Sequence, residues 1–275
     1  MLRSKFVKVL FISVALLFIA APGICYLQQK NNAYFSDENI DTASASSLEA
    51  QKAPLNKHAV KFVKNYIQQN NEDLSSIRQR SKYPFDMIDA IFKSYHLPVE
   101  LKYLAVIESE LKPTALSRVG AAGPWQLMPE TAKILGLKVT SKYDERRLYK
   151  KSTKAAAIYL RDLYAEFGDW LLVLAAYNGG PGPVNNAIRK SGSRNFWCLQ
   201  NYLPAESREH VKKFIATHYY FEGQGSITTL TRAEGLQYTR KMAALLAKQA
   251  ENKSVNHYTI AKDSSIVEKT VAARF

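Results

Sequence analysis

The chain has 275 residues, of which 38 are lysine or arginine and 24 are aspartate or glutamate, so its formal net charge is +14. A chain of this length can bury one sizeable core, and we expect one globular domain with short extensions. The positive charge favours polyanions such as cell-wall polymer or a membrane surface; the alternative is that it only keeps the surface soluble. Nucleic acid is not expected as a partner, because no nucleic-acid-binding motif is present.

The N-terminus has the pattern of an export signal. Three basic residues precede an apolar run from Val9 to Ala21, which is short for a membrane span. We therefore interpret residues 1–25 as a signal peptide cleaved near Gly23 to Cys25, with an uncleaved membrane anchor as the alternative. Lipidation of Cys25 is less favoured, because Ile24 stands where a small residue is usual. The expected location is the periplasm or a membrane of the cell envelope.

A polar linker and two helices are expected next. Residues 26–54 are rich in Asn, Ser, Ala, Asp and Gln, which is typical of a flexible linker. Leu55 to Asn70 predicts an amphipathic helix whose inward face holds Val60, Val63 and Ile67. Pro84 to Tyr95 predicts a second helix with inward residues Phe85, Ile88, Ile91 and Phe92.

The stretch Leu97 to Pro129 carries the most unusual residue of the chain. Pro98 favours the start of a short helix and Pro113 its end by about Leu111. On this helix Glu108 falls on the apolar stripe, which is otherwise formed by Leu97, Leu101, Leu104 and Leu111. A carboxyl among leucines loses hydration of its charged form, so it can hold a proton at neutral pH and donate it. The alternative is that Glu108 bends out to water or pairs with an arginine such as Arg118.

The second half of the chain continues as helices. A short helix is predicted for Glu130 to Leu135, ended by Gly136, and a polar loop for Val139 to Tyr149. The cap Ser152 and the terminator Gly168 predict a helix from Ser152 to Phe167. The nearly all-apolar run from Trp170 to Tyr177 suggests a buried helix. Two more helices are predicted for Pro183 to Lys190 and Ala205 to Phe221. With no convincing strand, the fold class is all-α, and residues 224–275 are expected to add a helical extension and a tail.

No metal or other cofactor is predicted. The five histidines are scattered, and no Cys and His cluster has the spacing of metal ligands. If cleavage removes Cys25, Cys198 is the last thiol and no internal disulfide can form.

Four motifs in order resemble a known family. They are Ile107-Glu108-Ser109, Gly120 to Pro129 (GAAGPWQLMP), Ala176 to Gly180 (AYNGG) and Leu203 to Arg208 (LPAESR). Together they resemble the catalytic domain of soluble lytic transglycosylases, which shares an all-α fold with goose-type lysozyme. The likeness is strongest to the membrane-bound lytic murein transglycosylase D type. It covers roughly Ala53 to Gly223, and we place the catalytic domain with its packing helices at residues 55–223.

The resemblance implies a role for each motif. Glu108 would be the catalytic acid, Ser117, Gln126 and Met128 would line the cleft, and Tyr177 and Asn178 would lie close to the glutamate. Each substrate-binding residue has a structural alternative. Met128 could belong to the core, Asn178 could form a turn, and Gln126 and Tyr177 could bond backbone groups instead of sugar.

The implied reaction is cleavage of the β-1,4 bond between N-acetylmuramic acid and N-acetylglucosamine in peptidoglycan, without water, giving 1,6-anhydro-muramyl products. The acetamido group and the 6-hydroxyl of the sugar would replace the second carboxylate that ordinary glycosidases use. The alternatives are a hydrolytic muramidase of lysozyme type and a non-catalytic peptidoglycan-binding protein. We expect a monomer acting on glycan strands, with membrane association through the N-terminus left open.

Three features depart from the family pattern. Pro124 and Trp125 stand where an apolar residue and a methionine or tryptophan are common, which is a tolerable change. His210 stands where a tyrosine is common near the start of the last helix, which puts a sugar contact from that position in doubt. The usual cell-wall-binding repeats of the D type are not recognisable after Gly223.

Overall fold

The computed structural model describes residues 53–250, and this part of the chain is helical with isolated bridges and no strand. The all-α prediction is confirmed. The α-helices are α3 (Lys57–Gln69), α4 (Asn71–Arg80), α5 (Lys82–Ser94), α6 (Tyr103–Ser109), α7 (Pro129–Ile134), α8 (Tyr149–Phe167), α9 (Trp170–Gly179), α10 (Pro181–Ser191), α11 (Phe196–Leu199) and α12 (Ala205–Glu222). Short 3₁₀ turns are η2 (Val99–Lys102), η3 (Glu145–Arg147), η4 (Gln200–Tyr202) and η5 (Ile227–Thr229), and residues 232–250 form a further helix.

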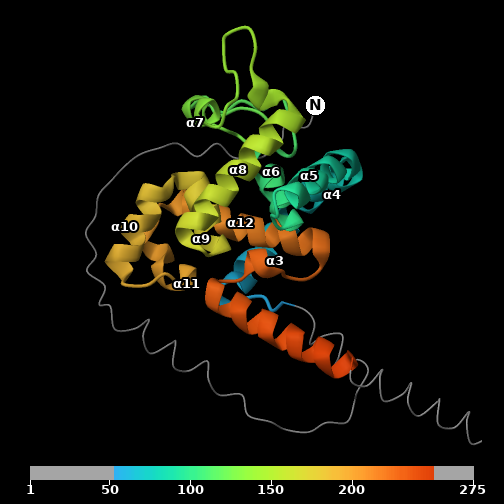
Figure 1. Ribbon diagram of the computed structural model, residues 1–275, viewed down its shortest axis with the longest axis vertical. Helices are drawn as coiled ribbons and strands as arrows, with labels where there is room; N and C mark the ends of the chain where they lie inside the picture. Colours follow the sequence, from blue (N-terminus) through green and yellow to red (C-terminus); the bar gives the residue numbers. More distant parts are fainter. Residues whose placement is uncertain (1–52, 251–275) are drawn as a thin grey trace, which may run out of the picture. The chain divides into compact units, whose positions relative to one another are not determined.

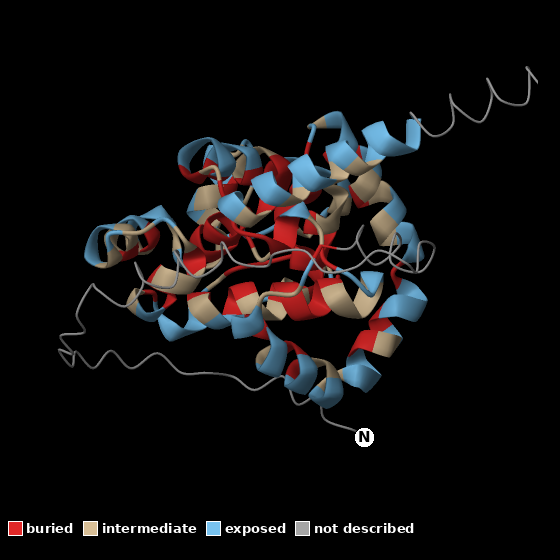
Figure 2. Ribbon diagram, turned by 90° about the horizontal axis from the view of Figure 1, so that it is seen from below, coloured by how far each residue is buried: buried red, intermediate tan, exposed pale blue. Residues whose placement is uncertain are grey.

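Helix α9 is buried along most of its length. Every residue from Trp170 to Ala176 is buried, as its apolar sequence predicts. Asp169 begins the helix, because its carboxylate accepts hydrogen bonds from the backbone N–H groups of Leu171 and Leu172. The helix packs against α8, α10 and α12, and Figure 2 shows buried residues gathered where the helices face one another. Only its last residues, beginning with Tyr177, leave the core.

Helix α12 lies among elements from the whole domain. It packs against α3, α6 and α9, and Figure 1 shows its ribbon in the middle of these helices. The inward residues Val211, Phe214 and Ile215 are buried, as the sequence predicts. Because α12 touches α6 and α9 at once, its first turns face the ends of both helices that carry predicted site residues.

The loop that follows α6 is held through its backbone. The guanidinium of Arg146 donates to the carbonyl oxygens of Gly120 and Leu127, at 2.7 and 2.9 Å, and is itself paired with Asp144. Gly123 has φ of 80°, and a methyl group there would lie 1.9 Å from the carbonyl oxygen of Arg146. The loop therefore packs directly on the η3 backbone, and the sequence prediction of an irregular Val139 to Tyr149 loop missed this 3₁₀ turn.

Three details of the helix predictions are wrong. Val60 is 47% exposed, and the buried face of α3 is formed by Ala59, Val63 and Tyr66 instead. Ser152 lies inside α8 rather than capping it, because the helix begins three residues earlier at Tyr149. Helix α4 was not predicted.

The stripe of the central segment is confirmed, with one difference in its helix. Leu97, Leu101, Leu104 and Leu111 are all buried. The predicted single helix is a 3₁₀ turn followed by α6, and it ends at Ser109 with Glu110 and Leu111 in the left-handed region, at φ of 56° and 63°.

The predicted signal, most of the linker and the tail after residue 250 lie outside the described residues, so the proposed domain boundaries there stay predictions. Within residues 53–250 no helix is long and apolar enough to cross a membrane. Cys198 is disulfide-bonded in the full chain. The expectation of a lone thiol applies only if cleavage removes Cys25, so it stays a prediction.

We predict that buried His218 makes stability fall as the pH drops from about 6.5 to about 4. Burial lowers the pKa of His218 to about 4, so in this window the unfolded chain binds a proton that the folded chain does not. The loss attributable to this residue is roughly 3 kcal/mol. Denaturant unfolding across this range checks it. His218→Gln is expected to flatten the curve, and His58→Gln, at an exposed position, is not; equal curves for all three proteins would contradict the prediction.

We also predict that Gly123→Ala is far more destabilising than Gly136→Ala. Both glycines have positive φ, at 80° and 83°, but nothing lies within 4 Å of a methyl group at Gly136. The strain of the left-handed backbone costs about 1–2 kcal/mol at each position, and the clash with η3 adds about 1–3 kcal/mol at Gly123 alone. Denaturant unfolding of both variants measures the difference, and equal losses would show that the loop does not depend on this close contact.

Candidate functional site

Glu108 lies in the last turn of α6 and is half-buried, with 15% of its side chain exposed. The buried leucines of the stripe lie on either side of it in the sequence, and Ser109 anchors the helix end by donating to the Pro124 carbonyl at 2.8 Å. The carboxylate is therefore fixed at the junction between α6 and the Ser117 to Pro129 loop.

The partner of Glu108 is His210 on α12. The Nε2 atom of His210 lies 2.8 Å from Oε1 of Glu108, and the imidazole is itself 8% exposed. The alternative of an ion pair with Arg118 is not what the structure has. Sequence reasoning missed this contact, although it noted that His210 departs from the family pattern.

Most acidic residues near Glu108 in the sequence are engaged elsewhere. Glu110 pairs with Lys112 and Arg80, at 2.6 and 3.6 Å, and Glu130 pairs with Lys133.

Asp144 and Glu145 are also occupied. Hydrogen bonds from Arg146 lower the pKa of Asp144, and a hydrogen bond from the Lys138 backbone N–H, with the Lys151 ammonium, lowers the pKa of Glu145. Both carboxylates are thus stabilised in their charged form by partners of their own.

The loop residues predicted to bind substrate hold different positions. Ser117 accepts a hydrogen bond from the Ala121 N–H at 2.9 Å, and Gln126 donates through Nε2 to the Gly123 carbonyl at 2.9 Å. Met128 is 42% exposed, so the alternative that it belongs to the core is wrong. The alternative that Gln126 bonds a backbone group therefore holds for its amide nitrogen.

Trp125 anchors the loop to helix α8. Its indole is fully buried and its Nε1 donates to Oγ1 of Thr153 at 2.9 Å, consistent with a structural role. The neighbouring Gln126 has φ of 45°, a backbone conformation that only a well-held loop keeps.

Tyr177 and Asn178 bring the end of α9 to the same region. The Tyr177 hydroxyl donates to the Trp125 carbonyl at 2.8 Å. Burial, with a smaller contribution from the negative charge of Glu108, raises the pKa of Tyr177 well above its ordinary value. The hydroxyl therefore keeps its proton and acts as a donor, not as a base.

Asn178 is held from α12. Its Oδ1 accepts a hydrogen bond from Oγ of Ser207 at 2.9 Å, and the helix break comes after it, at Gly180 with φ of 82°. The amide is therefore oriented by a side chain rather than by a turn. Ser207 was part of a motif but had no predicted role.

The structure thus connects the predicted residues through α12 and the loop backbone. Glu108 is linked to His210, Asn178 to Ser207, and Tyr177 to the carbonyl next to Gln126. For Ser117 and Met128 the structure shows placement on the same loop, without a direct bond to Glu108.

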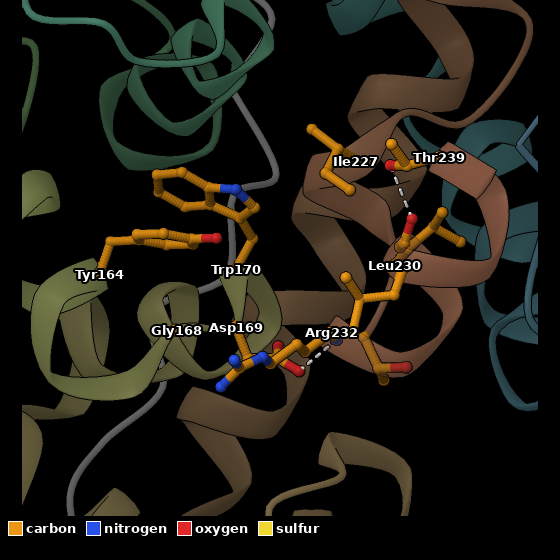
Figure 3. Close-up of a pocket in the computed structure, with 11 residues that line it drawn as sticks. Tyr164, Gly168, Asp169, Trp170, Ile227, Leu230, Arg232 and Thr239 are labelled. Atoms are coloured by element: carbon orange, nitrogen blue, oxygen red, sulfur yellow. Dashed lines mark hydrogen bonds between the residues drawn. The ribbon is translucent and has the colours of Figure 1, made fainter. Parts of the chain in front are cut away.

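Two cavities lie away from these residues. One, of about 310 Å³, lies between the α8–α9 junction and the segment from Ile227 to Thr239, where the rings of Tyr164 and Trp170 stack at 4.2 Å (Figure 3). The other, of about 420 Å³, is lined by α10 and the residues before α12. Neither is lined by a predicted site residue. Within residues 53–250 no group of three or more His, Cys, Asp or Glu side chains could hold a metal ion.

Comparison with known proteins identifies the domain. Residues 87–200 match the family described as "Transglycosylase SLT domain". The chain is 39% identical over 152 residues to membrane-bound lytic murein transglycosylase D of Escherichia coli K12, covering 54% of this chain and 33% of that protein. It is 34% identical over 122 residues to soluble lytic murein transglycosylase of Salmonella typhimurium, covering 42% of this chain and 19% of that one.

A solved structure is also similar. The 70 kDa soluble lytic transglycosylase of Escherichia coli aligns with a TM-score of 0.44 and 28% identity over 53% of this chain and 26% of that one. The chain spans about a third of the length of its membrane-bound relative. On the sequence matches, residues 87–200 of the chain form a transglycosylase SLT domain.

Proposed function

We propose that this protein cleaves the β-1,4 bond between N-acetylmuramic acid and N-acetylglucosamine in peptidoglycan without water, leaving 1,6-anhydro-muramyl ends. The observation that carries the proposal is the state of the carboxylates. Glu108 is half-buried among the family motifs with a histidine as its partner, whereas Glu110, Glu130, Asp144 and Glu145 are paired with lysine or arginine. Of these five carboxylates only Glu108 is not paired with lysine or arginine, which suits a reaction whose nucleophile comes from the substrate.

In the first step, Glu108 acts as the acid. Its carboxyl proton moves to the glycosidic oxygen as the bond from that oxygen to the anomeric carbon breaks, which leaves N-acetylglucosamine as an alcohol and Glu108 as a carboxylate. The acetamido oxygen of N-acetylmuramic acid forms a bond to the anomeric carbon and takes up its positive charge. This neighbouring group takes the place of the second carboxylate of ordinary glycosidases.

In the second step, Glu108 acts as the base. The 6-hydroxyl oxygen of the same sugar attacks the anomeric carbon, the bond to the acetamido oxygen breaks, and the hydroxyl proton returns to Glu108. The enzyme recovers its starting protonation, and the product is a 1,6-anhydro sugar. No water is consumed in this step. Partial burial of the Glu108 carboxylate limits the access of water and therefore favours this outcome over hydrolysis.

The remaining site residues would orient the sugar. Tyr177 keeps its proton and its oxygen still has an acceptor site beside its bond to Trp125. Asn178 uses Oδ1 on Ser207, so its NH₂ group is left to donate, and Gln126 uses Nε2 on Gly123, so its carbonyl oxygen is left to accept. Ser117 and the exposed Met128 would extend the contact along the loop.

The proposed cellular location rests on the N-terminal sequence. We propose export by residues 1–25, as a cleaved signal or retained anchor, with residues 26–54 as a linker, residues 55–223 as the catalytic domain and residues 224–275 as an extension. A net charge of +14 would hold such a domain near anionic cell-wall polymer.

The test is mass spectrometry of soluble products after the full chain is incubated with peptidoglycan. We expect anhydro-muramyl products from the wild type and a rate lower by about 10²–10⁴-fold for Glu108→Gln, which cannot donate the proton. Glu110→Gln is the matched control, two residues away and paired with Lys112, and is expected to keep activity.

Two results would contradict the proposal. Reducing-end products would indicate a hydrolytic muramidase that activates water. Binding of peptidoglycan without any soluble product, unchanged in Glu108→Gln, would indicate a binding protein.

A further inference from the structure

His210 is the one described side chain that hydrogen-bonds the carboxylate of Glu108. It lies in the second turn of α12, beyond residues 87–200 that match the family, and 102 positions away from Glu108 in the chain. Both side chains are largely shielded from solvent, so the 2.8 Å contact between Nε2 and Oε1 is partly buried. Such a contact affects the chemistry of the carboxylate more than an exposed pair would.

The surroundings of the ring decide which nitrogen carries the proton. Nδ1 of His210 is buried and has no hydrogen-bond partner among the described residues. A proton on Nδ1 would therefore be a buried donor without an acceptor, which is costly. With the proton on Nε2 the ring has no N–H group without an acceptor, and in this tautomer Nε2–H donates to Oε1 of Glu108.

We propose that His210 is a positioning residue that holds Oε1 of Glu108, so that Oε2 alone exchanges the proton with the substrate. This inference rests on the proposed function of Glu108 as acid and base. The alternative arrangement, with the glutamate donating from Oε1 to Nε2, would place the proton on the oxygen that faces the histidine and leave Nδ1–H buried without a partner.

The hydrogen bond is stronger when it is needed. While Glu108 carries its proton on Oε2, Nε2–H donates to an uncharged carboxyl oxygen. As the proton moves to the glycosidic oxygen, negative charge spreads over both carboxylate oxygens and the bond to Oε1 becomes charge-assisted. An interaction that strengthens on the way to the transition state raises kcat and leaves KM nearly unchanged. In the second step Oε1 stays bound to Nε2–H while Oε2 takes the proton of the 6-hydroxyl.

The same turns of α12 hold a second site residue. Ser207, three residues before His210, donates to Asn178 Oδ1 at 2.9 Å. The N-terminal part of α12 therefore fixes the carboxylate of α6 and the amide of α9 relative to each other.

The test compares two substitutions of His210 in the full chain on solubilised glycan strands of defined length. His210→Leu fills the space without a donor, and we expect kcat to fall by about 10- to 100-fold with little change in KM. His210→Gln places an amide NH₂ group at a similar reach and is expected to recover most of the rate. His218→Leu is the control: it removes another buried histidine of α12, and should lower thermal stability without lowering kcat.

The results separate the two proposals. If His210→Leu keeps the wild-type kcat, or if His210→Gln is no better than His210→Leu, the positioning role is wrong, because packing alone would explain the residue. The measured rates include glycosidic bonds cleaved with or without water. Reducing-end products would therefore overturn the transglycosylase proposal while the His210 series still reports on the acid.

Nuclear magnetic resonance of the full chain with ¹⁵N-labelled histidine gives a readout that needs no turnover. We expect a slowly exchanging imidazole N–H on Nε2 of His210, identified by its loss in His210→Gln. Glu108→Gln replaces the carboxylate by a weaker acceptor, so this proton signal should move upfield. A His210 signal with the proton on Nδ1, or one that Glu108→Gln leaves in place, would overturn the inference.

Discussion

The burial of α9 on all sides is the constraint on which the site depends. From Trp170 to Ala176 the helix offers no polar side chain, so it cannot shift along its axis or rotate without exposing apolar surface or opening voids. The first polar side chains after this buried run, Tyr177 and Asn178, are therefore held at fixed positions, with Tyr177 bonded to the loop that follows α6. Helix α12 packs on α9 and α6 together, and this is why one helix can hold both the amide of Asn178 and the carboxylate of Glu108.

The loop from Ser117 to Pro129 reaches comparable rigidity by another route. It has little regular structure, and its carbonyl groups are satisfied by side chains from other elements: Arg146 for Gly120 and Leu127, Ser109 for Pro124, and Tyr177 for Trp125. Buried backbone groups need such partners, and each partner fixes one point of the loop. Tyr177 thus fixes the loop while its oxygen remains available for its proposed role in the site. A hydroxyl that bonds a carbonyl as donor still has an oxygen able to accept from a sugar.

The sequence could predict what depends on local pattern and little of what depends on contacts between distant elements. Periodicity placed Leu97, Leu101, Leu104 and Leu111 inside, and the all-apolar run placed α9 in the core, because burial follows composition at helical spacing. It failed for Val60 and Ser152, where the wheel or the cap rule was applied to a helix whose neighbours and first residue were unknown. The contact between Glu108 and His210 joins residues 102 apart, and no local rule pairs them. The departure from tyrosine marked the position without giving its role.

In the proposed mechanism one carboxylate serves in two opposite steps, and the partner of Glu108 suits both of them. A lysine or arginine beside it, as for Glu110, would favour the charged form throughout and oppose the proton that the first step requires. An apolar neighbour would favour the protonated form and oppose its loss. A single N–H donor from His210 lies between these extremes, since it can bond the carboxyl in either state and gains strength as charge appears. A histidine N–H donor is therefore consistent with a residue that, in the proposed mechanism, gives up a proton and takes one back within the same cycle.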